Sequence, residues 1–266
     1  MKTGGPCKPG MRTVLRHDGE TIAYLQRPGK TPGVIWLGGF HSDMQGTKAV
    51  ALDQWAAKNA RAFLRFDYFG HGKSSGDFRD GTISRWRDDA LAVLDELTEG
   101  PQVLVGSSMG AWIALLGAKE RPKRIAALLL IAPAPDFTER LMWARMPEQI
   151  RQEIQHNGEW LRPSAYEDSP YPITLRLIED GRKHLLLDGP IQIDCPVHIL
   201  HGMRDPDVPW QHAIQLAERL PGNPVVTLIK HGDHRLSTPG DLDRIERILG
   251  ELLPPDTCLP APNPLI

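Results

Sequence analysis

Three side chains in this sequence have the types and the order that nucleophilic catalysis requires. Ser108 lies between two glycines in the pattern G-x-S-x-G, and Asp205 and His234 follow it along the chain. A serine hydroxyl is a weak nucleophile until a base takes its proton, and an acid must orient that base. We therefore expect Ser108 to be the nucleophile, His234 the base and Asp205 the orienting acid in the cleavage of an acyl bond.

Other residues compete for two of these roles. Asp207 shares a loop with Asp205 and is the alternative acid, and His231 is the alternative base. We favour Asp205 because it is nearer the end of the preceding predicted strand, and His234 because it lies deeper in the loop before the last helix. His71, in a Gly-His-Gly run, is interpreted as structural because a histidine nearer the C-terminus suits the base better.

The residues around Ser108 predict a strand, a sharp turn and a helix. A side chain at the tip of such a turn is pushed out of the packed layers toward solvent, and small flanking residues relieve the crowding. The Met109 amide then lies at a helix N-terminus, where an oxyanion is stabilised. A second amide is expected from Phe40, because the glycine pair before it follows a predicted strand and lets the backbone approach a ligand closely. Phe40 is expected to act through its amide and not through its ring.

Predicted strands alternate with predicted helices along most of the chain. This alternation predicts a mostly parallel central sheet with helices on both faces. The three residues expected to do chemistry each follow a predicted strand, so they are expected at one edge of the sheet. We predict a single α/β domain over residues 11–253, with a helical cap inserted at about 133–190 and a proline-rich tail at 254–266.

The predicted cap differs from the rest of the chain because prolines interrupt it and methionine and aromatic residues gather in it. We expect helices at 137–145, 147–156 and 173–187. Methionine and tryptophan suit an adaptable apolar pocket, so the cap is expected to lie over the site. The residues expected to line a substrate pocket are His41, Met142, Trp143, Met146 and Trp160. The alternative is that these side chains only attach the cap to the main domain.

The composition is that of an ordinary globular protein. Of the 266 residues, 41% are hydrophobic and 24% are charged, and the formal net charge is −2. This balance and the lack of basic runs argue against nucleic-acid binding. No apolar stretch is long enough to span a bilayer, and no metal-ligand or nucleotide-binding pattern is present. We expect a small-molecule or acylated-protein substrate, no metal and no cofactor, and the oligomeric state stays open.

The number and spacing of the cysteines indicate the cellular compartment in which the protein is expected. Cys7, Cys195 and Cys258 are an odd number without C-x-x-C spacing, which argues against a disulfide scaffold and fits a reducing compartment. The first residues contain neither the apolar core of a signal peptide nor the Arg- and Ser-rich leader typical of mitochondrial import. We therefore expect a cytoplasmic protein.

The combined motifs resemble the α/β-hydrolase superfamily. The match runs from about Gly33 to the last helix and includes the G-x-S-x-G turn, the run Arg65 to Tyr68 and the segments that hold the expected acid and base. The chain order of nucleophile, acid and base is the order of that superfamily. The resemblance implies an α/β-hydrolase fold, with the triad and the two oxyanion-hole amides at the positions expected above.

Within that superfamily the chain is most similar to the abhydrolase-domain palmitoyl-protein thioesterases, also described as mycophenolic acid acyl-glucuronide esterases. The shared features are Met44 to Ala49, Arg65 to Tyr68, and Cys195-Pro196 before the acid loop. The similarity implies a serine hydrolase that cleaves acyl esters or thioesters. The alternatives are a serine peptidase, a carbon–carbon bond hydrolase or a non-catalytic small-molecule-binding protein, since this fold serves several functions.

Overall fold

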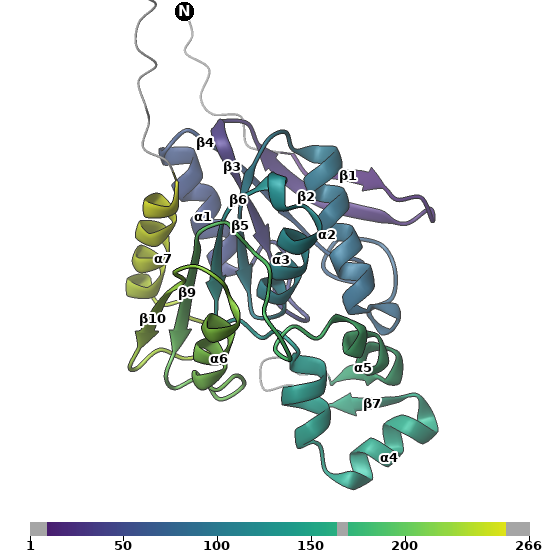
Figure 1. Ribbon diagram of the computed structural model, residues 1–266. Helices are drawn as coiled ribbons and strands as arrows, with labels where there is room; N and C mark the ends of the chain where they lie inside the picture. Colours follow the sequence, from purple (N-terminus) through teal and green to yellow (C-terminus); the bar gives the residue numbers. More distant parts are fainter. Residues whose placement is uncertain (1–9, 164–169, 254–266) are drawn as a thin grey trace, which may run out of the picture.

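The computed structural model of the protein describes residues 10–163 and 170–253, and its centre is an eight-stranded sheet (Figure 1). The strands are β1 (Arg12–Leu15), β2 (Thr21–Arg27), β3 (Lys30–Leu37), β4 (Arg61–Phe66), β5 (Gln102–Ser107), β6 (Ile125–Ile131), β9 (Val197–Gly202) and β10 (Val225–Ile229). Their order in the sheet is β1-β2-β4-β3-β5-β6-β9-β10. The β1–β2 hairpin is antiparallel, and the six strands that follow it run parallel to one another. The predicted mostly parallel sheet is confirmed.

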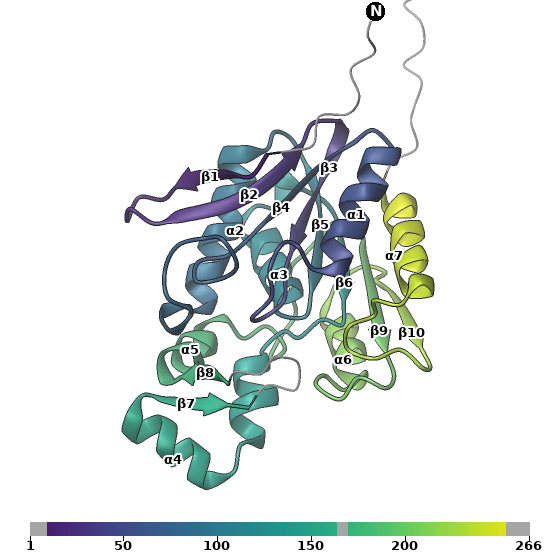
Figure 2. The same ribbon diagram turned by 180° about the vertical axis from the view of Figure 1, so that it is seen from behind.

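Helices cover both faces of this sheet (Figures 1 and 2). They are α1 (Thr47–Lys58), α2 (Ile83–Leu97), α3 (Met109–Glu120), α6 (Gln211–Arg219) and α7 (Pro239–Leu252), with short 3₁₀ turns η1 (Phe78–Asp80) and η2 (Pro122–Arg124). Along β3, Val34 and Trp36 share a core with α1 and α7. Ile35 and Leu37 share the opposite core with α2 and α3. Two cores form because successive side chains of a strand point to opposite faces of the sheet.

Two helices begin at threonine N-caps. The Thr82 hydroxyl accepts a hydrogen bond from the Arg85 amide at 3.1 Å at the start of α2. Thr238 and Asp241 form a reciprocal capping box at the start of α7. Such caps satisfy amides that have no partner inside the helix. The cap of α7 also fixes the end of the loop that carries His234.

The chain between β6 and β9, residues 132–196, is called the inserted segment below. It contains η3 (Phe137–Met142), η4 (Trp143–Arg145), α4 (Glu148–Asn157), β7 (Glu159–Arg162), β8 (Tyr171–Thr174), α5 (Leu175–Gly181) and η5 (Arg182–His184). Figures 1 and 2 place its helices and strands beyond the carboxyl ends of the parallel strands, while its last residues run back to the start of β9. It therefore lies on the side of the sheet where residues that follow the strands gather.

Two of the three helices predicted in the inserted segment are only partly helical. Residues 137–145 form a π-helical turn followed by a 3₁₀ turn, and residues 171–174 form β8, which pairs with β7 in an antiparallel ladder. Pro172 has no amide hydrogen and Ile173 is a buried β-branched residue, and both are tolerated better in an edge strand than inside a helix. The predicted helix at 147–156 is confirmed as α4.

The cysteines and the tail are only partly within the described residues. Cys7, Cys258 and the predicted tail at 254–266 lie outside them. Cys195 is half-buried with a free thiol, and burial raises the pKa of this thiol to about 11. A thiol with that pKa is protonated at neutral pH and therefore a poor nucleophile.

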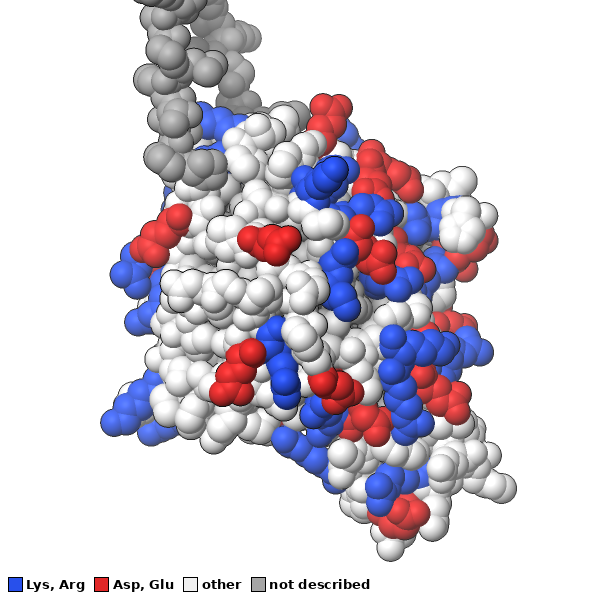
Figure 3. Space-filling model, viewed as in Figure 1, with Lys and Arg blue, Asp and Glu red and all other residues white. Residues whose placement is uncertain are grey.

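The surface carries charges of both signs. On the face shown in Figure 3, basic and acidic side chains are interspersed. Part of this mixing comes from exposed ion pairs such as Arg121 with Asp95 at 3.0 Å and Arg176 with Asp80 at 2.8 Å. Within the described residues, no helix is both long and apolar enough to cross a bilayer.

Candidate active site

Ser108 lies at a sharp turn between β5 and α3. Its backbone has φ 55° and ψ −115°, a conformation that a residue with a side chain adopts only under strain. The turn is held because the Ser108 amide donates to the Ile131 carbonyl at 2.9 Å and the Ala134 amide donates to the Ser108 carbonyl at 3.2 Å. Ser108 consequently lines a cavity instead of packing into the core.

The glycines on either side of Ser108 are required by close packing. A Cβ on Gly110 would lie 2.1 Å from the carbonyl oxygen of Leu37, and a Cβ on Gly106 would lie 2.5 Å from the carbonyl oxygen of Gly110. Both distances are shorter than any real Cβ contact, so a larger residue would displace the backbone. The G-x-S-x-G spacing is therefore what allows α3 to begin directly beside the loop that follows β3.

The structure brings together the three side chains that the sequence nominates for catalysis. The Nε2 atom of His234 lies 3.1 Å from the Ser108 hydroxyl oxygen, and Nδ1 of the same ring lies 2.6 Å from Oδ2 of Asp205. The serine follows β5, the aspartate follows β9 and the histidine follows β10. Parallel neighbouring strands thus deliver all three residues to one edge of the sheet.

Asp205 is held in its ionised form by its surroundings. Its side chain is fully buried, and Oδ1 accepts hydrogen bonds from the amides of Asp207 and Val208 at 2.9 and 2.8 Å. Nε2 of His201 lies 3.3 Å from Oδ2. Burial raises the pKa of Asp205, but hydrogen bonds from His201 and His234 and the further contacts lower it more, so the pKa lies below its ordinary value. His201 supports Asp205 through this contact.

The competing residues take other positions. Asp207 lines the cavity, while the carboxylate that contacts His234 is that of Asp205. His231 is exposed in the loop after β10. Ligand atoms of Asp205, Asp207 and His234 lie within 4.8 Å of one another, a separation that a metal ion could bridge. Because both oxygens of Asp205 already accept hydrogen bonds and Nδ1 of His234 already contacts Asp205, we assign no metal to this group.

The two predicted oxyanion donors lie beside Ser108. Among the described residues, the amides of Phe40 and Met109 donate to no acceptor. A Cβ on Gly39 would lie 3.4 Å from the Ser107 carbonyl oxygen and 3.6 Å from Cβ of Ser108, so the Phe40 loop approaches the serine turn closely. Buried amides seldom lack partners, and an unpaired pair beside a nucleophile has the arrangement that stabilises an oxyanion.

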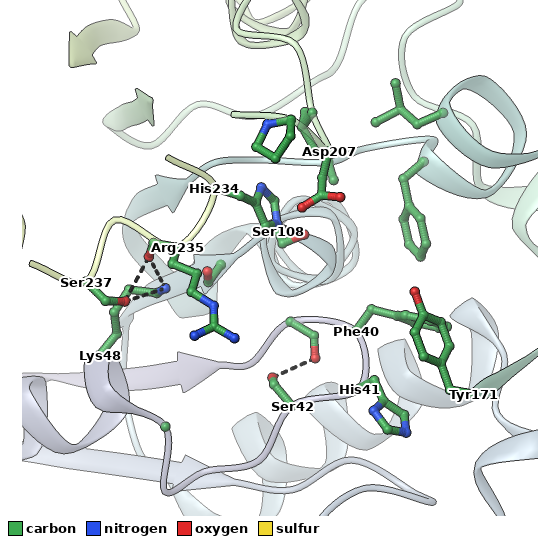
Figure 4. A pocket seen from close by; sticks show the side chains of 18 of the residues that line it. Phe40, His41, Ser42, Lys48, Ser108, Tyr171, Asp207, His234, Arg235 and Ser237 are labelled. Carbon is green, nitrogen blue, oxygen red and sulfur yellow. Dashed lines mark hydrogen bonds between the residues drawn. The ribbon is translucent and has the colours of Figure 1, made fainter. Parts of the chain in front are cut away.

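A cavity of about 670 Å³ opens beside Ser108, between the main domain and the inserted segment. Figure 4 shows Phe40 and Tyr171 on one side of it, Lys48, Arg235 and Ser237 on the other, and Ser108 and His234 between the two sides. The described lining residues include the aliphatic and aromatic side chains of Phe137, Leu141 and Met142. The volume lies within the range of roughly 300–1,000 Å³ that is typical of small-molecule sites.

Two of the five predicted pocket residues line this cavity and three do not. His41 and Met142 line it, whereas Trp143, Met146 and Trp160 are partly buried and pack against the core. Successive side chains of a helical turn point in different directions, so Met142 lines the cavity while Trp143 packs elsewhere. Trp143 packs under the guanidinium of Arg182 at 5.2 Å. For these three residues the alternative role, attachment of the inserted segment, is the better description.

Sequence reasoning missed the basic side of the cavity. Lys48 donates a hydrogen bond to the Arg235 carbonyl and lies 3.5 Å from the Ser237 hydroxyl. The pKa of Lys48 is lowered to about 8, chiefly because the side chain is buried; Asp233 opposes this shift and Arg235 adds to it. Lys48 therefore ties α1 to the loop that follows His234. The pattern that could have revealed it is its position in the first turn of the helix after the Phe40 loop.

The ring of Phe40 lies in an aromatic cluster that joins the main domain to the inserted segment. Phe78 and Trp86 of the main domain lie 5.0 and 5.8 Å from its centroid. Phe137 and Tyr171 of the inserted segment lie 5.6 and 5.8 Å away. All four contacts are edge-on, an arrangement that aromatic rings prefer. The ring thus anchors the residue whose amide is a predicted oxyanion donor.

A second group of serine, histidine and aspartate lies outside the cavity, and the sequence analysis did not identify it. The Ser84 hydroxyl oxygen is 2.8 Å from Oδ1 of Asp180 and 2.7 Å from Nε2 of His184. Asp180 Oδ2 also accepts the Ser84 amide at 2.7 Å, so its carboxylate caps the start of α2. The Oδ2 atom lies 3.9 Å from Nε2 of His184. These contacts join α2 to α5 and η5.

A parallel sheet with helices on both faces, and a strained serine between a strand and a helix at its carboxyl edge, together define the α/β-hydrolase class. The chain belongs to the alpha/beta hydrolase family, which it matches over residues 33–245. It is a hydrolase of that superfamily.

Curated relatives with this fold are named as thioesterases. The chain is 40% identical over 248 residues to the mitochondrial palmitoyl-protein thioesterase ABHD10 of Mus musculus, covering 92% of this chain and 83% of the relative. It is 37% identical over 248 residues to the protein of the same name from Homo sapiens, covering 92% and 81%.

Solved structures agree with this grouping. A protein from Agrobacterium vitis S4 described as a hydrolase is 47% identical, with a TM-score of 0.87, covering 92% of this chain and 98% of that one. The mouse alpha/beta hydrolase domain-containing protein 10 is 39% identical, with a TM-score of 0.85, covering 91% and 98%. The predicted fold class and the predicted resemblance are both confirmed.

The predicted cytoplasmic location is wrong by this comparison. Palmitoyl-protein thioesterase relatives from five mammals are all named mitochondrial. These names do not support the predicted cytoplasmic location. The prediction depended on the absence of leader and disulfide patterns, and a reducing environment does not distinguish one internal compartment from another.

Proposed function

We propose that this hydrolase cleaves acyl thioesters and acyl esters by covalent catalysis at Ser108. The proposal is carried by the chain of contacts from the Ser108 hydroxyl through His234 to the buried carboxylate of Asp205, at the wall of a cavity. The relatives named palmitoyl-protein thioesterase favour a long acyl group on sulfur. Acylated proteins and small acylated molecules are the proposed substrates.

In the proposed reaction, Nε2 of His234 takes the Ser108 proton as the serine oxygen attacks the acyl carbonyl carbon. The amides of Phe40 and Met109 donate to the oxyanion that forms. The protonated His234 then gives its proton to the departing thiol or alcohol, which leaves the acyl group esterified to Ser108. Asp205 stays ionised and stabilises the imidazolium in each step.

The second half of the reaction restores the enzyme. His234 takes a proton from a water molecule, whose oxygen attacks the ester carbonyl carbon. The same two amides stabilise the second oxyanion. The Ser108 oxygen leaves with the proton that His234 carries, and the carboxylic acid is released. The proposed reaction uses only the side chains and amides of this protein, the substrate and one water molecule.

The two sides of the cavity favour one orientation of the substrate. Leu141 and Met142 lie on the inserted segment and suit an acyl chain, because burying apolar surface is favourable. Lys48 and Arg235 lie across the cavity from Phe40 and Tyr171 and suit a polar leaving group. In this proposal the inserted segment, including residues 133–190, acts as a cap of the single domain and selects the acyl chain.

The test is hydrolysis of p-nitrophenyl esters of graded chain length and of an S-palmitoyl peptide. Wild type, Ser108→Ala and the control Ser84→Ala are compared, with fluorophosphonate labelling of each. We expect turnover and labelling in wild type and Ser84→Ala, and neither in Ser108→Ala. The control removes a serine that also contacts a histidine and an aspartate. It therefore shows whether the loss of activity is specific to Ser108 or follows from removing any serine with such contacts.

The outcomes separate the possible activities. Turnover of esters without the thioester would retain Ser108 and change the substrate class to carboxylic esters, acyl glucuronides included. Labelling that persisted in Ser108→Ala would refute the nucleophile. Absence of any turnover by wild type would refute the proposed hydrolysis and direct the search to peptide or carbon–carbon bond cleavage, or to binding without catalysis.

A further inference from the structure

The loop after β3 carries a second strained residue beside the predicted oxyanion donor. His41, which follows Phe40, has φ 56°, in the left-handed region that side chains disfavour. Such a conformation persists only when its surroundings hold it in place. A group that holds the His41 backbone therefore also limits how the Phe40 residue is oriented.

The group that holds this backbone is His71, in the loop after β4. Nδ1 of His71 lies 3.1 Å from the Phe69 carbonyl oxygen, and Nε2 lies 3.2 Å from the His41 amide nitrogen. A carbonyl oxygen can only accept, so Nδ1 must carry the proton. Nε2 then has a free lone pair, which accepts the hydrogen bond from the His41 amide. The two contacts require the same neutral tautomer.

The surroundings keep the His71 ring neutral and in one position. The ring is 5% exposed and packs edge-on against Phe78 and Trp86 at centroid separations of 5.0 and 5.2 Å. Burial lowers the pKa of His71 to about 4, although the Phe69 carbonyl opposes this shift. At neutral pH the Nε2 lone pair is therefore available to the His41 amide.

The far end of the same loop has its own attachment. Asp67 accepts the Met44 amide at 2.6 Å through Oδ1 and the Lys73 amide at 2.8 Å through Oδ2. Arg65 donates to the Met44 carbonyl at 2.7 Å. These bonds hold the loop near α1 without His71. At the end that carries the predicted oxyanion donor, the Ser42 hydroxyl donates to the Gly39 carbonyl at 2.8 Å, and His71 adds the bond to the His41 amide.

We infer that His71 is a positioning residue for the oxyanion hole: it fixes the peptide between Phe40 and His41, which is joined at the Phe40 Cα to the peptide that carries the Phe40 amide, and so limits the direction of that amide. This inference rests on the proposed function, because it concerns a donor to the oxyanion of acyl transfer. His71 itself touches neither the substrate nor Ser108. Its effect is transmitted through one peptide unit and appears only when charge develops on the carbonyl oxygen.

Two substitutions separate the two hydrogen bonds of His71. In His71→Asn the shorter amide can donate to the Phe69 carbonyl from the position of Nδ1 but does not reach the His41 amide. In His71→Gln the longer amide presents an oxygen near the position of Nε2 and can accept from His41. The matched control is Tyr68→Phe. It removes a buried hydroxyl from a ring whose centroid lies 5.8 Å from that of His71, and it changes neither hydrogen bond of His71.

The measurements are kcat and KM on a p-nitrophenyl ester, and inhibition by a trifluoromethyl ketone that forms a tetrahedral adduct with Ser108. We expect His71→Asn to lower kcat by about 10–100-fold, somewhat less than the loss of a whole donor. KM should stay nearly unchanged, and the ketone should bind more weakly by a similar factor. His71→Gln should recover most of kcat, and Tyr68→Phe should match wild type.

Other outcomes overturn the inference. Asparagine and glutamine variants with equal kcat would show that the bond to His41 is not used in catalysis. A lower kcat with unchanged affinity for the ketone would place the defect outside the oxyanion hole. If His71→Asn does not fold, the Gln variant decides: a folded Gln variant with the low kcat expected of Asn refutes the inference. Wild-type turnover and its loss in Ser108→Ala test the proposed function separately.

Discussion

Among the described residues, two groups of serine, aspartate and histidine lie within contact distance, and they differ in the contacts of the histidine ring. In both groups the serine comes first in the chain, then the aspartate, then the histidine. His234 contacts Ser108 with Nε2 and Asp205 with Nδ1, so the carboxylate orients the ring from the side opposite the serine. In the second group Ser84 and Asp180 both approach Nε2 of His184, at 2.7 and 3.9 Å. In this group the Asp180 carboxylate does not contact Nδ1 of His184, so it does not orient the ring from the side opposite the serine.

The backbone conformation around the two serines also differs. Ser108 lies at a strained turn beside a cavity and two amides without acceptors among the described residues. Ser84 lies in the first turn of α2, and its amide is already bonded to Asp180. Under the proposed function, the same three residue types make a nucleophile in one place and a helix cap in the other, according to the backbone geometry and the amides that lack acceptors. Contact distances alone do not distinguish the two.

The largest expected difference is between the two histidines. His234→Ala should lower kcat on a p-nitrophenyl ester on the order of 10⁴–10⁶-fold, because the base is lost. His184→Ala should leave kcat almost unchanged and lower the melting temperature instead. Steady-state kinetics and thermal unfolding of the two variants check this. A similar loss of kcat in both would mean that the second group also supports the reaction.

The two aspartates should differ by a smaller factor. Asp205→Asn should lower kcat on the order of 10⁴-fold, because the ring loses its orienting partner and takes the wrong tautomer. Asp180→Asn should retain kcat. The same ester assay measures both. If Asp207→Asn proved as damaging as Asp205→Asn, the acid would have to be shared between the two loop carboxylates.

The second group should appear as stability that depends on pH. Burial raises the pKa of Asp180, but bonds from the Ser84 amide and hydroxyl and from other neighbours lower it below its ordinary value. A lowered carboxyl pKa stabilises the fold above the unfolded pKa of about 3.9, and this stability is lost as pH falls through the native pKa. At pH 7, Asp180→Asn should reduce the free energy of unfolding by about 1.5–3 kcal/mol.

Denaturant unfolding at several pH values measures this effect. The difference between wild type and Asp180→Asn should shrink toward zero as the pH is lowered below about 3.9. A difference that stayed constant through the acid range would mean that the carboxylate charge is not what stabilises the start of α2. The control is the activity of Asp180→Asn at pH 7, which should be unchanged because the carboxylate that caps α2 lies outside the cavity.

The smallest expected effect concerns the cavity wall. Met142→Ala should reduce the preference for long over short p-nitrophenyl esters by about tenfold, because the acyl chain loses apolar contacts. Trp143→Ala, one residue further, should leave this preference unchanged and lower stability. The ratio of kcat/KM for long and short esters measures the effect. A shift in the Trp143 variant of equal size would show that the inserted segment affects chain length through its overall packing.

Much of the fold could be predicted because the signals are local. The strands are short apolar runs between turn residues, and Thr82 and Thr238 cap helices through bonds to residues three positions away. The G-x-S-x-G turn is equally local, since its glycines contact each other and the adjacent loop. Predictions of this kind need no knowledge of distant contacts.

The inserted segment was predicted less well because distant contacts decide its conformation. The β7–β8 pair joins Trp160 to Ile173, and helical spacing in the sequence does not reveal such a pairing. Residues 137–145 form a π-helical turn and a 3₁₀ turn in place of the predicted helix, and local periodicity does not distinguish these from an α-helix. His71 shows the same limit, because its contact with His41 crosses 30 positions of the chain.

The aromatic contacts of Phe40 have a consequence for how acyl preference can change. Phe137 and Tyr171 belong to the segment proposed to recognise the acyl chain, yet both rest on the ring of a residue proposed to stabilise the oxyanion. A substitution that reshapes this wall for a different chain also alters the packing around the Phe40 loop. Selectivity and turnover are therefore coupled in this scaffold, and a chimaera that exchanges the inserted segment must bring ring partners for Phe40 with it.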